Sequence, residues 1–222
     1  MFRIKICGIT TAADAEAAIE AGANAIGLNF YPASRRHLDM PGACEISRAI
    51  GTRATKVGVF VNASAEDIKA AVKRVGLDVV QLHGDEPPEL LAALGDVPIV
   101  RAFRDADPSA IAKYLAACAE LDAQPVMLLV DGAAPEQQGT TQYGGTGVRA
   151  DWDRLRAAQF GVPLVLAGGL VPENVAEAIA KVRPAAVDTA SGVETSPGRK
   201  SRELMQAFVE AASKAFAGLG PL

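Results

Sequence analysis

The sequence has few of the features expected of a nucleic-acid-binding or membrane protein. It contains 22 Lys and Arg against 26 Asp and Glu, a formal net charge of −4, and no long basic block. Its densest basic stretches, residues 34–37 and 198–202, are typical of local anion sites or solvated surface. No apolar run reaches the roughly 18 residues of a membrane span, and residues 1–7 lack the apolar segment and cleavage site of a signal peptide. We therefore expect no nucleic-acid partner and no membrane association.

Cysteine is scarce as well. Cys7, Cys44 and Cys118 cannot all pair within one chain, and their spacing does not match a metal site. This pattern predicts a reducing, cytoplasmic compartment and no bound metal ion. The chain has no linker and no low-complexity segment. Its 222 residues, half of them hydrophobic, fit one domain or two and can bury a sizeable core. The regular spacing of its short apolar runs favours a single domain over residues 1–222.

What the sequence does contain is a regular alternation of short apolar runs with longer stretches rich in Ala, Glu, Lys and Arg, one unit about every 28 residues. The expected strands are Arg3–Ile6, Ala25–Phe30, Lys56–Val61, Val79–Leu82, Ile99–Phe103, Val126–Val130, Pro163–Leu166 and Ala185–Val187. The expected helices are Ala12–Ala21, Pro41–Ile50, one from Ser64 to a stop at Gly76, Pro87–Leu94, Pro108–Ala119, Asp151–Ala158, Pro172–Val182 and Ser201–Ala217, the last stopped by Gly218.

Eight strands, each followed by a helix, is the count of a (β/α)8 TIM barrel. The apolar runs do not alternate strictly with polar residues, as expected for parallel strands that helices cover. An open, doubly wound sheet also produces this alternation and is the competing fold. The count of eight favours the barrel, in which the active site lies at the carboxyl ends of the strands.

Two residues at these strand ends are candidates for acid–base chemistry. Cys7 ends the first strand; a lone cysteine is usually a small buried hydrophobe, but a thiolate here can accept a proton. Asp131 follows five apolar residues, where a carboxylate is either a solvated turn residue or an acid whose pKa burial raises. The residues alone leave both alternatives open at each position.

Three further side chains at strand ends are candidates for substrate contact. Arg36, in the long loop after the second strand, is either a surface charge or a fork suited to a carboxylate. His83, after the fourth strand, is a base, a substrate donor or a packed histidine, and we expect it to contact substrate without a catalytic role. Asp188 follows the eighth strand with the same ambiguity as Asp131.

The last two strand-end loops predict a phosphate site. Gly168 and Gly169 follow the seventh strand, and Ser191 and Gly192 follow the eighth. Barrels often bind phosphate between these two loops, on backbone N–H groups that glycine leaves accessible. The alternative is that the glycines only make turns; their position favours phosphate.

The connection Gly132–Ala150, with a glycine-rich stretch at residues 144–147, is longer than the ~2–6 residues usual between a strand and a helix. Its length favours a lid over the site. A plain surface loop is the alternative.

Nine segments form an ordered set of motifs: 5–10 (KICGIT), 30–36 (FYPASRR), 57–62 (VGVFVN), 80–86 (VQLHGDE), 144–147 (GGTG), 167–170 (AGGL), 172–175 (PENV), 187–194 (VDTASGVE) and 197–198 (PG). Together they resemble the phosphoribosylanthranilate isomerase family of tryptophan biosynthesis. One such motif would be weak evidence. The ordered set spans nearly the whole chain and is highly specific.

The resemblance implies an Amadori rearrangement, without a cofactor, of a small phosphorylated aminoaldose, N-(5-phosphoribosyl)anthranilate, into 1-(2-carboxyphenylamino)-1-deoxyribulose 5-phosphate. It implies that Cys7 is the general base and Asp131 the general acid. It also assigns Arg36 to the anthranilate carboxylate, Asp188 to the bridging nitrogen, and the last two strand-end loops to the phosphate. The residue before this arginine is often proline in the family and is Arg35 here; we assign the carboxylate to Arg36. The sequence is compatible with a monomer or a homodimer.

Two other functions share parts of this pattern. The related isomerase of histidine biosynthesis acts on another aminoaldose and carries an aspartate where this chain has Cys7. A non-catalytic barrel that binds sugar phosphates needs neither Cys7 nor Asp131. Both residues therefore favour the isomerase of tryptophan biosynthesis, and kinetic assays on both aminoaldoses would detect a dual-specific enzyme.

Overall fold

Eight parallel strands close into a barrel in chain order in the computed structural model, which describes residues 1–104, 107–132, 150–158 and 160–219. The strands are β1 (Ile4–Cys7), β2 (Ala25–Asn29), β3 (Thr55–Phe60), β4 (Val79–Leu82), β5 (Ile99–Phe103), β6 (Met127–Val130), β7 (Leu164–Leu166) and β8 (Ala186–Thr189). Strand β1 pairs with both β2 and β8, which closes the sheet. The predicted barrel is confirmed, and the open doubly wound alternative is wrong.

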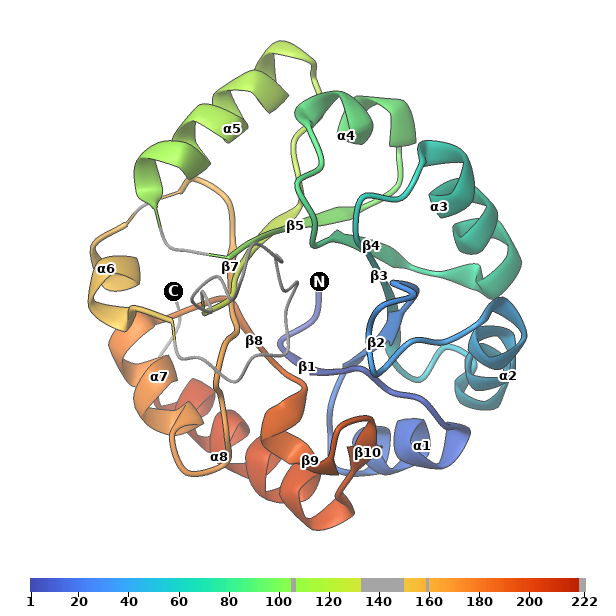
Figure 1. The fold of residues 1–222 in the computed structure, drawn as a ribbon. Coiled ribbons are helices and arrows are strands. Elements are labelled where there is room, and N and C mark those ends of the chain that lie inside the picture. The colour runs from blue at the N-terminus through green and yellow to red at the C-terminus, as the bar shows by residue number, and fades with distance from the viewer. Residues whose placement is uncertain (105–106, 133–149, 159, 220–222) are drawn as a thin grey trace.

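Helices form an outer ring around this barrel (Figure 1). They are α1 (Ala12–Glu20), α2 (Met40–Ile50), α3 (Ala65–Ala71), α4 (Pro88–Leu94), α5 (Pro108–Glu120), α6 (Trp152–Ala157), α7 (Val175–Val182) and α8 (Arg202–Gly218). The helix predicted from Ser64 to Gly76 is present as α3 and a π-helical turn, η1 (Val72–Gly76), that continues it. Three short elements were not predicted: a 3-10 turn η2 (Ser191–Val193) and the hairpin strands β9 (Glu194–Ser196) and β10 (Arg199–Lys200).

Local signals set most helix ends where the sequence predicts them. The Ser64 hydroxyl accepts the Asp67 N–H at 3.1 Å and donates to the Asp67 carboxylate at 2.7 Å, so Ser64 is the N-cap of α3, where the helix was predicted to begin. Glycines with positive φ angles stand at the ends of four predicted helices, at Gly22, Gly51, Gly76 and Gly95, where a left-handed residue ends a helix without strain. The expected stop before Gly218 is wrong by one residue, because α8 includes Gly218 as its last residue and Leu219 is the C-cap.

The core has two layers. Alternate strand residues point into the barrel, where Val57, Val100, Leu129 and others form a buried apolar cluster. The intervening residues, such as Ile6 and Val187, pack outward against the helices. Because side chains alternate along a strand, Cys7, His83, Asp131 and Asp188 all follow the inward-facing series of their strands.

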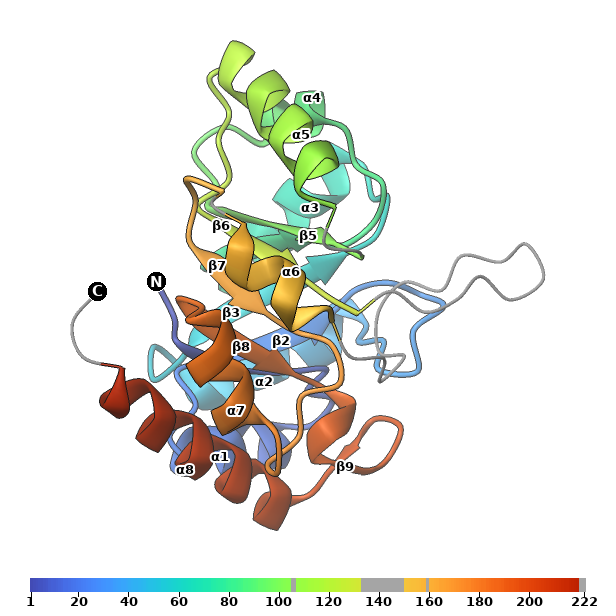
Figure 2. The same cartoon turned by 90° about the vertical axis from the view of Figure 1, so that its left-hand side faces the viewer.

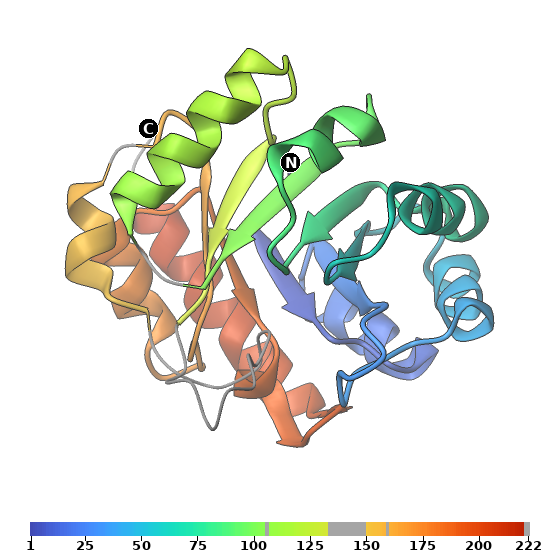
Figure 3. The same cartoon turned by 45° about the horizontal axis from the view of Figure 1, so that its top comes forward.

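The carboxyl ends of the strands carry the long connections. The segment from β2 to α2 and the β9–β10 hairpin lie on the same side of the barrel, opposite the N-terminus (Figure 2). Figure 3 shows the strands side by side within the ring of helices. None of the described helices is long and apolar enough to cross a membrane.

Candidate active site

Strand β1 places a lysine and a cysteine on the interior face of the barrel. Lys5 is fully buried, and its ammonium group donates to the Asp188 carboxylate from β8 at 2.7 Å. Burial alone would lower the pKa of Lys5, but Asp188 and Cys7 outweigh this effect and raise it. The lysine is therefore a fixed positive charge beneath the strand ends. Its place in the site was not predicted from the sequence.

Asp188 is held by this lysine through only one of its two oxygens. Its second oxygen, Oδ1, is buried and has no hydrogen-bond partner among the described residues. Burial raises the pKa of the Asp188 carboxyl, Lys5 opposes this rise, and the nearby Asp131 adds to it. An unsatisfied buried acceptor is costly, which makes Oδ1 available to an N–H or O–H group of a ligand.

Cys7 is a free, partly buried thiol at the end of β1. Burial raises its pKa, while the charges of Lys5 and Lys200 pull it down and Asp188 raises it further. Burial therefore disfavours the thiolate form of Cys7. The two lysines supply the positive potential that stabilises a thiolate.

Asp131 and His83 meet across the interior of the barrel. His83 Nε2 lies 3.5 Å from Asp131 Oδ2, and the other oxygen of Asp131 accepts the Gly132 N–H at 2.8 Å. Gln81, on the same face of β4, contacts His83 Nδ1 through its amide at 2.8 Å and so fixes the imidazole ring. His83 Nε2 is buried without a hydrogen-bond partner among the described residues. Beside its 3.5 Å contact with Asp131, Nε2 can therefore make a hydrogen bond to a ligand.

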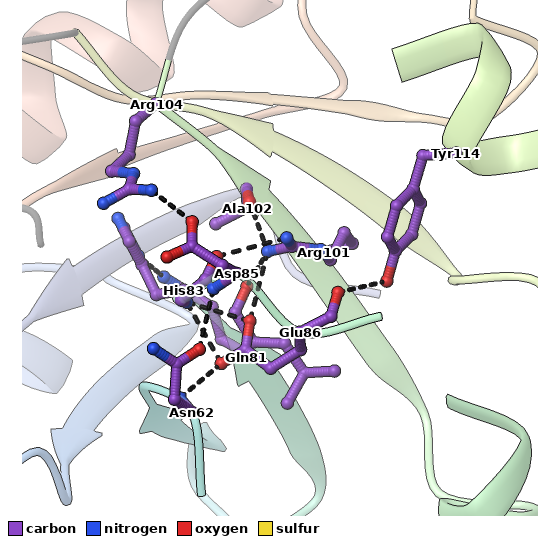
Figure 4. Close-up of polar contacts among 11 residues, drawn as sticks. Asn62, Gln81, His83, Asp85, Glu86, Arg101, Ala102, Arg104 and Tyr114 are labelled. Atoms are coloured by element: carbon purple, nitrogen blue, oxygen red, sulfur yellow. Dashed lines mark hydrogen bonds and ion pairs between the residues drawn. The ribbon is translucent and has the colours of Figure 1, made fainter. Parts of the chain in front are cut away.

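A buried ion pair supports the loop that carries His83 (Figure 4). Glu86 accepts the backbone N–H groups of Asn62 and Gly84, and lies 3.3 Å from Arg101. Arg101 in turn donates to the carbonyls of residues 82, 84 and 102. The loop after β4 is thus tied to the ends of β3 and β5, so His83 is presented by a rigid frame.

Arg36 reaches the site from the loop after β2. Its side chain crosses Gly8, where an added Cβ would lie 2.3 Å from Arg36 Cδ, and Gly8 has φ +71°. Both observations require glycine beside Cys7. The guanidinium is held by Glu194 through two hydrogen bonds of 2.7 Å. The neighbouring Arg35 is exposed, so Arg36 is the arginine that faces the site.

The two loops predicted to hold phosphate contact each other. An added Cβ on Gly192 would lie 1.9 Å from the Leu170 carbonyl oxygen, and the Thr189 hydroxyl donates to the same oxygen at 2.8 Å. Gly168 and Gly169 have φ angles of +83° and +60°. Ser191 and Gly192 form the 3-10 turn η2 directly after β8. This close packing makes one shared loop surface at the carboxyl ends of β7 and β8.

Most of the predicted residues therefore gather at one end of the barrel: Cys7, Arg36, His83, Asp131 and Asp188 at its mouth, and Gly168, Gly169, Ser191 and Gly192 beside it. Nearly all of the predicted lid, including residues 144–147, lies outside the described residues. Within the described ranges, no three His, Cys, Asp or Glu side chains gather as a metal site.

Four polar residues of the site were missed. Lys5 lies two residues before Cys7, and Gln81 two residues before His83, so their side chains also point into the barrel. This alternation along the strand is the signal that could have identified them. Glu194 carries no comparable signal, and Lys200 was noted only as part of the basic stretch 198–202, because the hairpin that brings both residues to Arg36 was not predicted. The site as a whole combines a thiol, a carboxyl group and cations, which suits proton transfer on an anionic substrate.

The chain is similar to known proteins over nearly its whole length. The family model described as N-(5'phosphoribosyl)anthranilate (PRA) isomerase matches residues 4–211. An N-(5'-phosphoribosyl)anthranilate isomerase from Myxococcus xanthus (strain DK1622) is 47% identical over 211 residues, which cover 95% of either chain.

Two solved structures share its fold closely. The phosphoribosyl anthranilate isomerase of Thermotoga maritima has a TM-score of 0.81 at 36% identity, covering 96% of this chain and 100% of that chain. A phosphoribosyl anthranilate isomerase in complex with reduced 1-(o-carboxyphenylamino)-1-deoxyribulose 5-phosphate has a TM-score of 0.78 at 35% identity, with the same coverage.

Proposed function

The chain belongs to the N-(5′-phosphoribosyl)anthranilate isomerase family, and we propose that Cys7 and Asp131 are the base and the acid of its reaction. The reaction is an aldose–ketose isomerisation in tryptophan biosynthesis, the Amadori rearrangement of a phosphorylated aminoaldose. One acid and one base on different strands of the barrel can flank a single sugar, which is the arrangement that this chemistry needs.

Asp131 starts the rearrangement in this proposal. Its carboxyl group donates a proton to the ribose ring oxygen, the bond from that oxygen to C1 breaks, and the nitrogen lone pair forms an iminium at C1. The carboxylate that remains is next to His83 Nε2, 3.5 Å from Oδ2, and accepts the Gly132 N–H through Oδ1. These neighbours support a carboxylate that carries charge after proton transfer.

Cys7 completes the rearrangement as a thiolate. It removes the proton from C2, which the iminium has made acidic, and the electron pair of the C–H bond moves into the iminium to give an enol that tautomerises to the ketose. Lys5 and Lys200 support this role because both charges favour the thiolate against the effect of burial. Each proton transfer is expected to contribute about 10²–10⁴-fold to the rate.

The remaining site residues position the substrate. Arg36 meets the anthranilate carboxylate, and Asp188 accepts the N–H of the bridging nitrogen through Oδ1, the buried oxygen without a partner among the described residues. His83 contributes a hydrogen bond from or to the substrate. Gly168, Gly169, Ser191 and Gly192 bind the phosphate through their backbone N–H groups. Anchors at both ends hold the sugar between the acid and the base, where proximity lowers the barrier.

A reducing compartment suits this chemistry. Cys7, Cys44 and Cys118 are all free thiols, and the proposed base must stay reduced to act. We therefore place the enzyme in the cytoplasm.

Cys7→Ala tests the proposal directly. The variant should lose at least about 10²-fold in kcat, while its affinity for reduced 1-(o-carboxyphenylamino)-1-deoxyribulose 5-phosphate stays within about threefold of the parent. Calorimetry gives the affinity and a continuous fluorescence assay gives the rate. Cys44→Ala, at a half-buried position on α2 outside the site, is the matched control and should leave both values unchanged. Equal losses of rate and affinity in Cys7→Ala would assign the thiol to binding and overturn its role as the base.

A further inference from the structure

The proposed carboxylate anchor, Arg36, belongs to a buried cluster of three charges. Glu194 on β9 accepts from Arg36 Nε through one oxygen and from a terminal guanidinium nitrogen, Nη2, through the other, both at 2.7 Å. Lys200 on β10 donates to Glu194 Oε1 at 2.7 Å. The Lys200 side chain is fully buried, and Glu194 is 4% exposed. A two-oxygen contact of this kind fixes the plane of the guanidinium.

The geometry leaves one edge of this guanidinium for a ligand. Arg36 carries five N–H groups in a planar fork, and Glu194 occupies the edge made by Nε and Nη2. The other edge, made by Nη1 and Nη2, has no acceptor on Nη1 among the described residues. The cluster holds two cations and one anion, so one positive charge remains to meet a carboxylate. An isolated Arg–Glu pair would be neutral and would offer none.

The same hairpin is attached to the proposed phosphate loop. Lys200 Nζ donates to the Ala190 carbonyl at 2.9 Å, directly before Ser191. The Ser201 N–H donates to the Val193 carbonyl at 2.9 Å, and the Thr10 hydroxyl donates to the Gly198 carbonyl at 3.0 Å. The hairpin therefore lies between the loop after β1 and the loop after β8, and joins the two proposed anchoring ends of the substrate.

We propose that Glu194, held by Lys200, is a positioning residue that turns the free edge of Arg36 toward the carboxylate of the substrate. Glu194 does not touch the substrate itself. The inference rests on the proposed role of Arg36 as the carboxylate anchor. It predicts that Glu194 governs how strongly the enzyme recognises the carboxylate, and that it has little effect on recognition of the phosphate or on proton transfer.

A pair of ligands separates this role from a merely structural one. The probes are the reduced carboxyphenylamino deoxyribulose phosphate and the same compound without its carboxyl group, made from aniline. For the parent, calorimetry should give at least about tenfold tighter binding of the carboxylated ligand, because charge-assisted pairs contribute at this level. Glu194→Gln should reduce this preference about tenfold and change the affinity for the carboxyl-free ligand by less than about threefold. In steady-state assays, its KM should rise about tenfold with kcat within about threefold.

Further variants keep the test decisive. Glu194→Asp retains the charge and should recover part of the preference; it also serves as the test if the Gln variant does not fold. In an Arg36→Ala background, Glu194→Gln should cause no further loss of preference for the carboxylated ligand, because Glu194 acts only through the Arg36 guanidinium. Glu210→Gln, in an exposed ion pair with Lys214 on α8, is the matched control and should have no effect.

Each contrary outcome has a distinct meaning. A parent that binds both ligands equally would overturn the proposed role of Arg36 and this inference with it. A parent that prefers the carboxylate, with a Glu194→Gln variant that keeps the full preference, would overturn the inference alone. Equal weakening of both ligands would show that Glu194 only stabilises the loops, and would also overturn it.

Discussion

Replacing Lys5 with methionine tests the electrostatics at the centre of the barrel. Methionine keeps the length and the apolar stem of the side chain, so the variant removes the charge with little change in packing. The Lys5 side chain is fully buried and Asp188 is 7% exposed, and their atoms are 2.7 Å apart. The substitution therefore leaves the Asp188 carboxyl buried without its cation.

The size of the effect follows from this burial. Breaking a buried pair by removing one partner costs about 3–5 kcal/mol, because the remaining charge is not compensated. A solvent-exposed pair contributes only about 0–1 kcal/mol. We expect Lys5→Met to lower the free energy of unfolding by about 3–5 kcal/mol, as for a buried pair. The double variant Lys5→Met/Asp188→Asn should recover most of the loss, because it removes both charges together.

Urea unfolding followed by circular dichroism measures these changes, provided that the slope with urea is unchanged between variants. Lys181→Met is the matched control. Lys181 pairs with Asp153 at 2.8 Å on the surface, where Asp153 is 77% exposed, and its loss should cost no more than about 1 kcal/mol. A Lys5→Met variant as stable as this control, or a double variant no more stable than the single one, would refute the reasoning.

The remaining predictions concern Cys7, Gly8, Glu194 and Tyr114. Lys5→Met removes a cation that lowers the pKa of the Cys7 thiol, so iodoacetamide should alkylate Cys7 more slowly in this variant at pH 7, as measured by mass spectrometry of the Cys7 peptide; an equal or faster rate would contradict the electrostatic role of Lys5. Gly8→Ala places a methyl group in the path of Arg36 at φ +71°, and should destabilise the fold by about 1–2 kcal/mol and raise KM; an unchanged KM would show that Arg36 is not displaced. Burial alone would raise the pKa of Glu194, but Arg36 and Lys200 outweigh burial and lower this pKa below its usual 4.5. The Glu194 carboxylate therefore stabilises the fold above that pH, and this stabilisation is lost as the pH falls through the pKa of the folded state. Glu194→Gln should therefore lose less stability than the parent between about pH 5 and pH 3, and parallel stability curves would contradict the shift. Burial raises the pKa of Tyr114 to about 12, so a tyrosinate absorbance titration should contain a late step that Tyr114→Phe removes; persistence of that step would assign it elsewhere.

The barrel and the strand-end positions of Cys7 and Asp131 were predictable from local patterns, whereas the proposed roles of these two residues came from the resemblance to the family. Each strand is a short apolar run, and period-two alternation carries Cys7 and Asp131 into the interior once the strands are correctly placed. The order of strands then brings β1 and β6 to the same mouth of the barrel. Placing these residues needs only the local sequence of each strand and the number of strands, eight.

The electrostatic surroundings were not predictable in the same way. The alternation along β1 predicts that Lys5 points inward, but nothing near it in the sequence indicates that it pairs with Asp188, 183 residues later. Arg36 and Glu194 are 158 residues apart, and their contact depends on a hairpin of two very short strands with weak sequence signals. Long-range pairs of this kind follow from closure of the barrel, which no local window of sequence records.

The acid–base assignment is tested most directly by the rearrangement itself. Freshly prepared N-(5-phosphoribosyl)anthranilate is mixed with the parent and with Asp131→Asn, and the fall in anthranilate-type fluorescence is followed. We predict rapid loss of fluorescence with the parent and at least about a 10²-fold slower loss with a folded Asp131→Asn variant that still binds the reduced product analogue. Turnover by Asp131→Asn at a rate close to that of the parent would contradict the account.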